Sequence, residues 1–314
     1  MATVRVLVVA GGGGGSAGTA GGGGAGGVVE DPALDLMTGT YPVTVGAGGR
    51  GSLTYVNVDN TTALGENGED STFATITAQG GGHGANSYPG GGHNGGNGGS
   101  GGGGGRYNSD EGEPGLGSTG GDGCDASTIT HQNGGGGGGG GGASGDATTV
   151  NGADGVASDI SGTSTYYGGG GGGAGYLNDW GNGGLGGGGK GGATVSQQPP
   201  TAGEDGTGGG GGAGWTYADS LGMAGGSGIV IVRYPTGTFV SATGGTVTID
   251  GSDTIHTFTA SGSFVCEAPT AGLPPIALTA QALGTVVLDA DAESDTIVVS
   301  HVRKGRVTLS EEMV

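Results

Sequence analysis

Residues 4–15 read VRVLVVAGGGGG, in which a dense apolar run ends directly against five glycines. The apolar half predicts a β-strand over residues 1–10, because β-branched side chains favour an extended chain. The glycine half has no side chains to bury, so its backbone is either unstructured or held by hydrogen bonds between chain segments. Far downstream, IVIVRY at residues 229–234 follows a glycine-rich stretch and predicts a second strand.

Glycine supplies 90 of the 314 residues. The longer runs of the chain's middle occupy residues 80–82, 90–92, 101–105, 134–142, 168–173, 186–189 and 208–212. Polar or aromatic inserts separate these runs, and this alternation indicates rods joined by loops.

Three ordinary uses of glycine do not fit these runs. Collagen needs glycine at every third position with abundant proline, whereas these glycines are contiguous and the chain has only 10 prolines. The flanking strands and aromatic inserts argue against a plain flexible tether. A phosphate-binding loop needs a hydroxyl residue directly after its lysine, which GGGGKGGAT at residues 186–194 lacks.

A bundle of extended glycine helices is the remaining interpretation. A helix of the polyproline II type has three residues per turn and no internal hydrogen bonds, so its N–H and C=O groups need outside partners. Neighbouring glycine helices supply them, because only glycine lets backbones approach so closely. The sequence therefore predicts packed polyglycine II helices, and the run at residues 134–142 would span about 28 Å in this form.

Alternating apolar and polar residues predict further short strands on both sides of this bundle. They are YPVTVGAGG at 41–49, SLTYVNVDN at 52–60, STFATITAQ at 71–79, FVSA at 239–242, TVTID at 246–250 and TIHTFTASGSFV at 254–265. No segment shows a helical period. The expected fold class is mostly irregular and all-β, with packed polyglycine II helices, flanking β-strands, a small C-terminal β domain and essentially no α-helix.

Composition shifts divide the chain into three parts. Residues 1–265 form a glycine-rich domain with a flanking β-sheet. Prolines in residues 266–275 indicate a linker. Residues 276–314 predict a small β meander that serves attachment or assembly.

Charge and hydropathy exclude two classes of partner. Eight basic residues against 28 acidic ones leave a net charge of −20, and nucleic acid binding needs clustered lysine and arginine. Membrane insertion is not expected either, because the apolar run Val6–Ala10 is far too short to cross a bilayer.

Residues with catalytic or metal-binding chemistry are scattered. His83 and His93 flank glycine turns, but no carboxylate or cysteine stands at ligand spacing, so no metal site is expected. No serine sits in a nucleophile elbow. We therefore expect no enzyme activity and no cofactor. Cys124 and Cys266 leave two readings open, one bridge or two free thiols.

The chain resembles the glycine-rich domain of phage tail-fibre and adhesin proteins. The resemblance rests on segments 4–15, 38–49, 71–82, 160–175, 183–192 and 225–235, which follow the family's order. It implies a polyglycine II bundle whose end loops contact a host receptor. One departure is that this sequence opens with the domain, where long fibres usually carry an N-terminal attachment module. The strand motif at 242–265 follows the domain, and it either folds back onto the first strand or opens a second repeat.

Aromatic residues in the inserts are the candidates for receptor contact, because aromatic side chains give large contact area at low entropic cost. The candidates are Tyr107, Trp180, Tyr176 and Tyr88, together with the polar neighbour Asn108. Binding is expected through the loops 106–114, 122–133, 146–167 and 176–180. Tyr166, Tyr167 and Trp215 adjoin glycine runs and are expected to pack. The alternative is that these rings cover the ends or flanks of the glycine bundle.

Together these features predict a virion structural protein of the tail-fibre or adhesin type, acting outside the cell. Its partners would be other virion or fibre subunits and a glycan or protein receptor on the host surface. The chain would act as a homotrimer or as a monomer. The alternatives are a purely architectural virion subunit, such as a head fibre or capsid decoration, and a non-viral extracellular filament protein.

Overall fold

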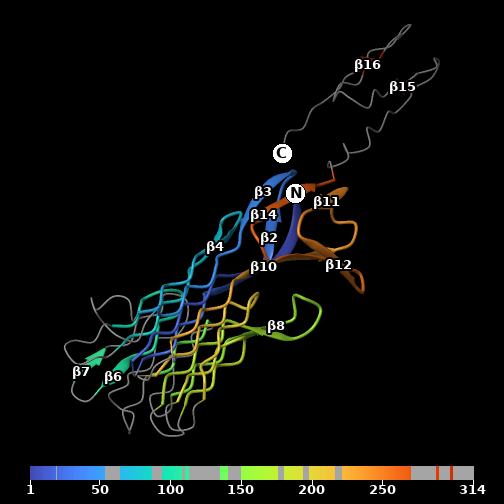
Figure 1. Ribbon diagram of the computed structural model, residues 1–314. Coiled ribbons are helices and arrows are strands. Elements are labelled where there is room, and N and C mark those ends of the chain that lie inside the picture. Colours follow the sequence, from blue (N-terminus) through green and yellow to red (C-terminus); the bar gives the residue numbers. More distant parts are fainter. Residues whose placement is uncertain are drawn as a thin grey trace. The chain divides into compact units, whose positions relative to one another are not determined.

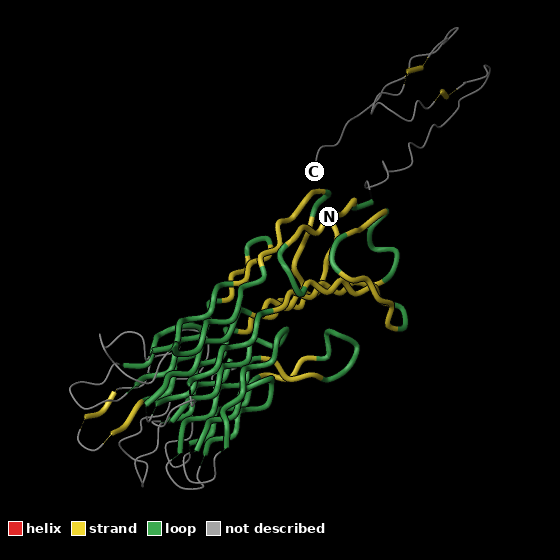
Figure 2. Tube along the Cα trace, viewed as in Figure 1, coloured by secondary structure: helices red, strands yellow, loops and turns green. Residues whose placement is uncertain are grey.

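The computed structural model describes residues 1–18, 20–53, 64–86, 94–107, 110–112, 135–140, 150–175, 180–193, 198–215 and 221–269, with the pairs 288–289 and 298–299. It divides into two units, residues 1–269 and 270–314. The described residues contain β-strands, turns and extended segments but no helix (Figures 1 and 2), and hence no helix able to span a membrane. In the second unit β15 (Leu288–Asp289) pairs antiparallel with β16 (Val298–Val299). The rest of the predicted meander lies outside the described residues.

Five antiparallel strands form sheet A, in the order β12-β13-β10-β1-β2. Their bounds are β1 Ala2–Val9, β2 Val28–Leu36, β10 Ile229–Pro235, β12 Thr246–Asp250 and β13 Asp253–Phe258. The strands predicted from VRVLVVA and IVIVRY are confirmed, and they lie side by side as β1 and β10.

Sheet B has the strand order β11-β14-β3-β4-β5. Its bounds are β3 Gly39–Thr44, β4 Ser71–Phe73, β5 Ile76–Ala78, β11 Ser241–Thr243 and β14 Gly262–Glu267. Most of the strand predicted at 52–60 lies outside the described residues. The segment 242–265 folds back onto the same unit, since β13 pairs with β10 and β14 pairs with β3.

Apolar side chains of the two sheets meet in one core. Sheet A contributes Val6, Val8 and Val232, and sheet B contributes Phe73 and Phe264. The opposite face of sheet A is buried too, in a cluster of Leu7, Val9, Ile160, Tyr167, Ile229, Ile231 and Ile255. Burial on both faces explains why residues 6–9 of β1 and residues 229–232 of β10 are uninterrupted apolar runs rather than alternating ones.

The strand β2 was not predicted, because its sequence VVEDPALDL contains a proline and three acidic residues. It is the outer strand of sheet A, next to β1. Its register against β1 shifts between the pairs Val4–Leu34 and Val6–Asp31, which leaves one extra residue on β2 around Pro32. Edge strands and bulges are the places where a sheet accepts proline, which has no N–H to donate.

We call the extended segments that connect the strands the glycine body. Its members are residues 10–18, 20–27, 45–53, 64–70, 79–86, 94–104, 135–140, 150–155, 168–175, 180–193, 198–215 and 221–228. Figure 2 draws these segments as green lines running beside one another below the strands. Their backbones are joined by direct N–H to C=O hydrogen bonds of about 3 Å, typical of protein hydrogen bonds.

The hydrogen bonds of segment 10–16 repeat every three residues. Its N–H groups donate to three segments in rotation: Ala10, Gly13 and Ser16 to 21–27, Gly11 and Gly14 to 66–69, and Gly12 and Gly15 to 223–226. Its C=O groups accept from three other segments, 49–52, 81–84 and 211–214. Every backbone polar group of Gly11 to Gly15 is therefore paired without help from a side chain.

The contacts inside the body leave no room for a β-carbon. An added Cβ at Gly13 would overlap the carbonyl group of Gly82, and one at Gly23 would overlap the carbonyl group of Gly13. These overlaps are with backbone atoms, which cannot rotate away as a side chain can. Close backbone approach therefore requires glycine at these positions.

Outer segments of the body need less glycine. In segment 46–52 the buried residues are Gly46, Gly49 and Ser52, while Ala47 and Arg50 are exposed. Polar side chains there replace a missing neighbour: Asn67, Asp70, Asn151, Asp154 and Asp205 each accept a hydrogen bond from a backbone N–H group. The inserts containing residues 150–155 and 198–206 were interpreted as loops, which is wrong for these residues, because they are hydrogen-bonded outer segments of the body.

Candidate functional site

The glycine body has two different ends. Strands of the two sheets hold one end, and the other, which we call the far end, carries the hairpin of β6 (Gly105–Tyr107) and β7 (Asp110–Gly112) (Figure 1). A second hairpin, β8 (Val156–Ser158) with β9 (Thr165–Tyr167), lies beside the sheets instead. The two hairpins therefore lie at opposite ends of the glycine body.

Buried serines tie segments together towards the far end. The Ser16 hydroxyl donates to the Gly84 carbonyl oxygen at 2.5 Å and accepts from the Gly65 N–H group at 2.9 Å. The Ser52 hydroxyl accepts from the Gly222 N–H group at 2.7 Å. A serine hydroxyl can serve as both donor and acceptor, and Ser16 uses both to join two other segments to its own.

Small residues and one tryptophan close the body at the far end. Ala20, Ala174 and Ala213 pack against Trp215, whose exposed fraction is 3%. The prediction that Trp215 packs is therefore confirmed, and the same holds for the buried Tyr167. The prediction for Tyr166 is wrong: it is 43% exposed, because neighbouring residues of a strand point to opposite faces.

Two of the five candidate contact residues fall within the described residues, both next to the far end. Tyr107 ends β6, shortly after Gly103, whose N–H group donates to Gly22. Trp180 is half-buried and precedes Gly181, whose N–H group donates to the Gly173 carbonyl oxygen at 3.0 Å. The N–H group of Ala174, next to Gly173, donates to the carbonyl oxygen of Ala20, close to Gly22. This hydrogen bond joins the segments that neighbour Trp180 and Tyr107. Asn108, Tyr176, Tyr88 and the side chain of Tyr107 lie outside the described residues.

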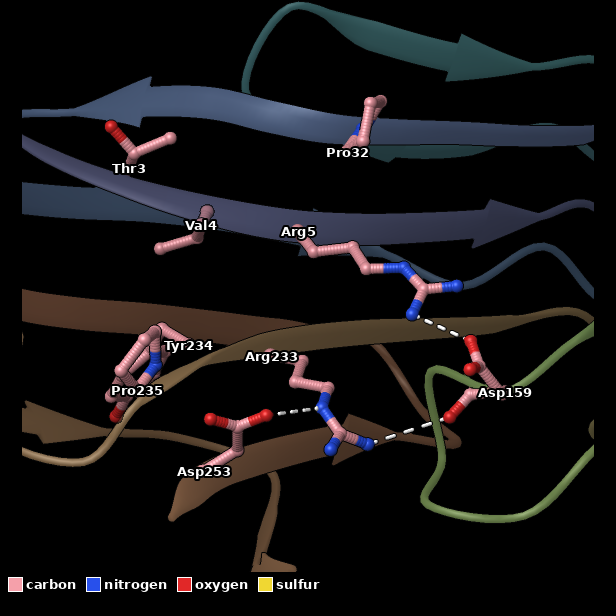
Figure 3. Close-up of a pocket in the computed structure, with 9 residues that line it drawn as sticks. All are labelled: Thr3, Val4, Arg5, Pro32, Asp159, Arg233, Tyr234, Pro235 and Asp253. Carbon is pink, nitrogen blue, oxygen red and sulfur yellow. Dashed lines mark hydrogen bonds and ion pairs between the residues drawn. The ribbon is translucent and has the colours of Figure 1, made fainter.

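A hollow of about 320 Å³ opens beside the sheets (Figure 3). It is lined by Thr3, Val4, Arg5, Pro32, Asp159, Arg233, Tyr234, Pro235 and Asp253. Arg5 Nη1 lies 2.6 Å from Asp159 Oδ1, and Arg5 Nε lies 2.5 Å from Glu30 Oε1. The hydrogen bond from Arg5 lowers the pKa of Asp159, so this carboxylate is held ionised.

Arg233 completes the cluster from the neighbouring strand. Its Nε lies 2.8 Å from Asp253 Oδ2, and its Nη2 lies 2.9 Å from Asp250 Oδ2. Its Nη1 donates to the backbone carbonyl oxygens of Asp159 and Ile160, each at 3.4 Å. The hydrogen bond to Asp253 raises the pKa of Arg233. Arg5 and Arg233 together act as a clamp that holds Asp159 and Ile160 of the hairpin β8–β9. Because both guanidinium groups are already paired, neither is free to bind an anionic ligand in the hollow.

This clamp changes the interpretation of the loop expected at 146–167. Residues 156–167 were expected among the receptor-contact loops, but they lie against sheet A, with Ile160 and Tyr167 buried in its outer cluster. These residues pack there because they bury the apolar face of β1 and β10, which would otherwise be exposed to water.

Titratable groups also cluster in the core. His256, Tyr234 and Cys266 are buried there, and Cys266 is a free thiol. Burial lowers the pKa of His256, raises the pKa of Tyr234 to about 12 and raises the pKa of the Cys266 thiol. All three are therefore neutral at neutral pH. Within the described part of the chain, no three His, Cys, Asp or Glu side chains are grouped to hold a metal ion.

Comparison with known proteins gives one match. The family model for the glycine-rich domain matches residues 1–235, which end with β10. No curated protein and no solved structure matches the chain. Strands β11 to β14 lie beyond the match, although they complete both sheets. Since the match covers well over half of the 314 residues, the chain belongs to the glycine-rich domain family.

Proposed function

We propose that this chain is a virion structural protein of the tail-fibre or adhesin type, which recognises a host surface through loops on a polyglycine II scaffold. One observation carries the proposal: the sheets hold one end of the glycine body, and Tyr107 and Trp180 lie next to the other. A rigid support with aromatic residues at its free end suits surface recognition, because such residues contribute much contact area at low entropic cost.

The polyglycine II form of the scaffold is supported by the hydrogen bonds of segment 10–16. They rotate among neighbours with a period of three, which is the number of residues per turn in this helix. The six neighbours of the segment, three accepting and three donating, are what hexagonal packing of such helices requires. The overlaps that a Cβ would make inside the body are a second support.

In this proposal the chain works outside the cell as part of a virus particle, without catalysis or a cofactor. Its partners are other virion or fibre subunits and a glycan or protein receptor. A net charge of −20 disfavours nucleic acid as a partner.

Electron microscopy with gold-labelled antibody on the intact particle tests the position of the chain. Label at the distal ends of tail fibres is the expected result. Label over the capsid or along a shaft would leave the architectural alternative, a head fibre or capsid decoration. Absence of the chain from particles would favour a non-viral filament protein.

Binding of the purified full chain to host cells tests the surface. We expect Trp180→Ala and Tyr107→Ala to weaken binding by about tenfold or more, as loss of an aromatic anchor does. The matched control is Tyr166→Ala, which removes an exposed aromatic residue beside the sheets. Equal losses in all three variants, or no loss in any, would count against recognition at the far end.

A further inference from the structure

Strand β12 has one unpartnered edge. It is the outer strand of sheet A and pairs on its other side with β13. Residues 246–249 are all exposed, including Val247 at 50% and Ile249 at 63%. Among the described residues no strand pairs with this edge.

The other three edges of the two five-stranded sheets carry features that oppose pairing. The strand β2 has a bulge at Pro32 and the acidic residues Glu30, Asp31 and Asp35. Strands β5 and β11 have three residues each. Short length, charge, proline and bulges are the usual protections of an edge strand. In contrast, β12 has five residues, no bulge and one charged residue, Asp250, which is 2.9 Å from Arg233.

The exposed apolar side chains continue the buried surface of the sheet. Val247 is opposite His256 and Ile249 is opposite Thr254, and opposite residues of antiparallel strands share a face. On that face His256 is fully buried by the rings of Tyr234 and Phe264. This face of the sheet is therefore buried at β13 and exposed at its neighbour β12.

We propose that β12 pairs antiparallel with β12 of a second copy of this chain, about a twofold axis at Thr248. In this register Val247 faces Ile249 of the second copy, Thr248 faces its own equivalent, and Thr246 faces Asp250. The two five-stranded sheets become one continuous sheet.

The sequence of β12 is what selects a second copy. Around Thr248 its residues form β-branched pairs on one face and a threonine pair on the other, both favourable across strands. In this register no two side chains of like charge face each other, although each chain has a net charge of −20. Addition of β12 to β2 of another copy would instead meet Pro32 and its acidic neighbours. The paired contact is isologous and closes as a dimer.

Five residues per strand bury less area than a standard stable interface, so the dimer is weak and depends on concentration. Sedimentation equilibrium of the full chain measures the dissociation constant of this dimer. The experiment covers a wide concentration series at about 0.15 M ionic strength, which screens the negative charge. We expect a monomer–dimer equilibrium whose dissociation constant rises by about tenfold or more in Val247→Lys and Ile249→Lys, since each buries a lysine at the interface.

Val265→Lys is the matched control, because Val265 is a β-branched residue on another strand with 43% exposure. It should leave the dissociation constant unchanged. Thermal unfolding of all three variants checks that the fold is retained. A monomer at every concentration, or association that is equally strong in the lysine variants, overturns the proposal.

Cross-linking tests the axis. Two equivalent residues facing each other across antiparallel strands have Cα atoms about 4.5–5.5 Å apart, within reach of a disulfide. Thr248→Cys should therefore give a covalent dimer under mild oxidation, whereas Thr246→Cys, which would face Asp250, should not. The two native cysteines are common to both variants. Equal cross-linking of both variants, or none with Thr248→Cys, contradicts the twofold register.

Discussion

The hydroxyl group of Tyr234 lies 2.7 Å from Nε2 of His256 in the core between the two sheets. The other ring nitrogen, Nδ1, lies 2.7 Å from the Gly244 carbonyl oxygen. A carbonyl oxygen only accepts, so Nδ1 carries the ring proton and Nε2 accepts from Tyr234. The neutral imidazole thus satisfies both partners, and a second ring proton would remove one acceptor.

Acid should therefore destabilise the fold through His256. Burial lowers its pKa in the folded chain below the ordinary 6.5, so the unfolded chain takes up this proton first as the pH falls. The contribution of neutral His256 to the free energy of unfolding therefore decreases below about pH 6.5, until the pKa of the folded chain is reached. The slope is at most about 1.4 kcal/mol per pH unit. Urea unfolding from pH 8 to pH 5 measures it against His256→Gln, which can keep both hydrogen bonds without titrating. A difference between the two proteins that does not change with pH contradicts this assignment.

Gly13→Ala should prevent folding or cost more than about 4 kcal/mol, because its Cβ would overlap the backbone of Gly82. Soluble yield and urea unfolding give the readout. The control Gly39→Ala adds the same methyl group where the nearest atom, in the Tyr41 ring, is 3.7 Å away. A stable Gly13→Ala protein would show that the body can separate its segments.

Ser16→Ala should lower the free energy of unfolding by about 1–3 kcal/mol, because it leaves the buried Gly65 N–H group unpaired. Ser261→Ala is the control. It also removes a hydroxyl that accepts from a backbone N–H group, that of Val45, but on the surface, where water replaces it. Urea unfolding should rank the loss at Ser16 well above the loss at Ser261, and the reverse order would be evidence against burial as the cause.

Arg233→Met should lower the free energy of unfolding by about 1–2 kcal/mol, since it removes charge-assisted hydrogen bonds from the clamp. Hydrogen exchange should locate the effect in the hairpin β8–β9. Arg50→Met breaks the exposed pair with Glu66 and should have a smaller effect, as surface ion pairs do. If Arg233→Met left exchange in residues 156–167 unchanged, the clamp would not hold the hairpin.

Prediction from sequence succeeded where a segment's role depends on its own residues. The strands β1 and β10 could be recognised because burial on both faces demands contiguous apolar residues. It failed at β2, where Pro32 and its acidic neighbours suit a bulged outer strand.

A weaker signal in the outer segments of the body was missed. Gly152 and Gly155 stand three residues apart in a stretch that was interpreted as an insert, and an added Cβ at either would overlap a neighbouring backbone carbonyl group. A segment whose neighbours repeat every three residues and that packs on one side needs glycine only at every third position. The same period could have identified this outer segment.

The candidate surface could be anticipated only as a set of residue types. Aromatic residues between glycine runs indicated contacts or caps. Adjacency to a glycine run correctly predicted the burial of Trp215, which packs among alanines, and Trp180 is half-buried near the far end, but the same rule failed at Tyr166. Tyr167 and Tyr166 adjoin in sequence and differ in burial because β9 turns them to opposite sides.

The amino-acid order alone was enough to establish that strands alternate with glycine segments, because strand propensity and the absence of side chains are local properties. It could not establish which segments are neighbours. Segment 10–16 hydrogen-bonds with residues as distant as 226, and one glycine offers the same N–H and C=O groups as any other. The neighbours and their register come from the folded chain, where the paired strands of the two sheets anchor the segments that adjoin them at one end and buried serines tie segments together towards the other.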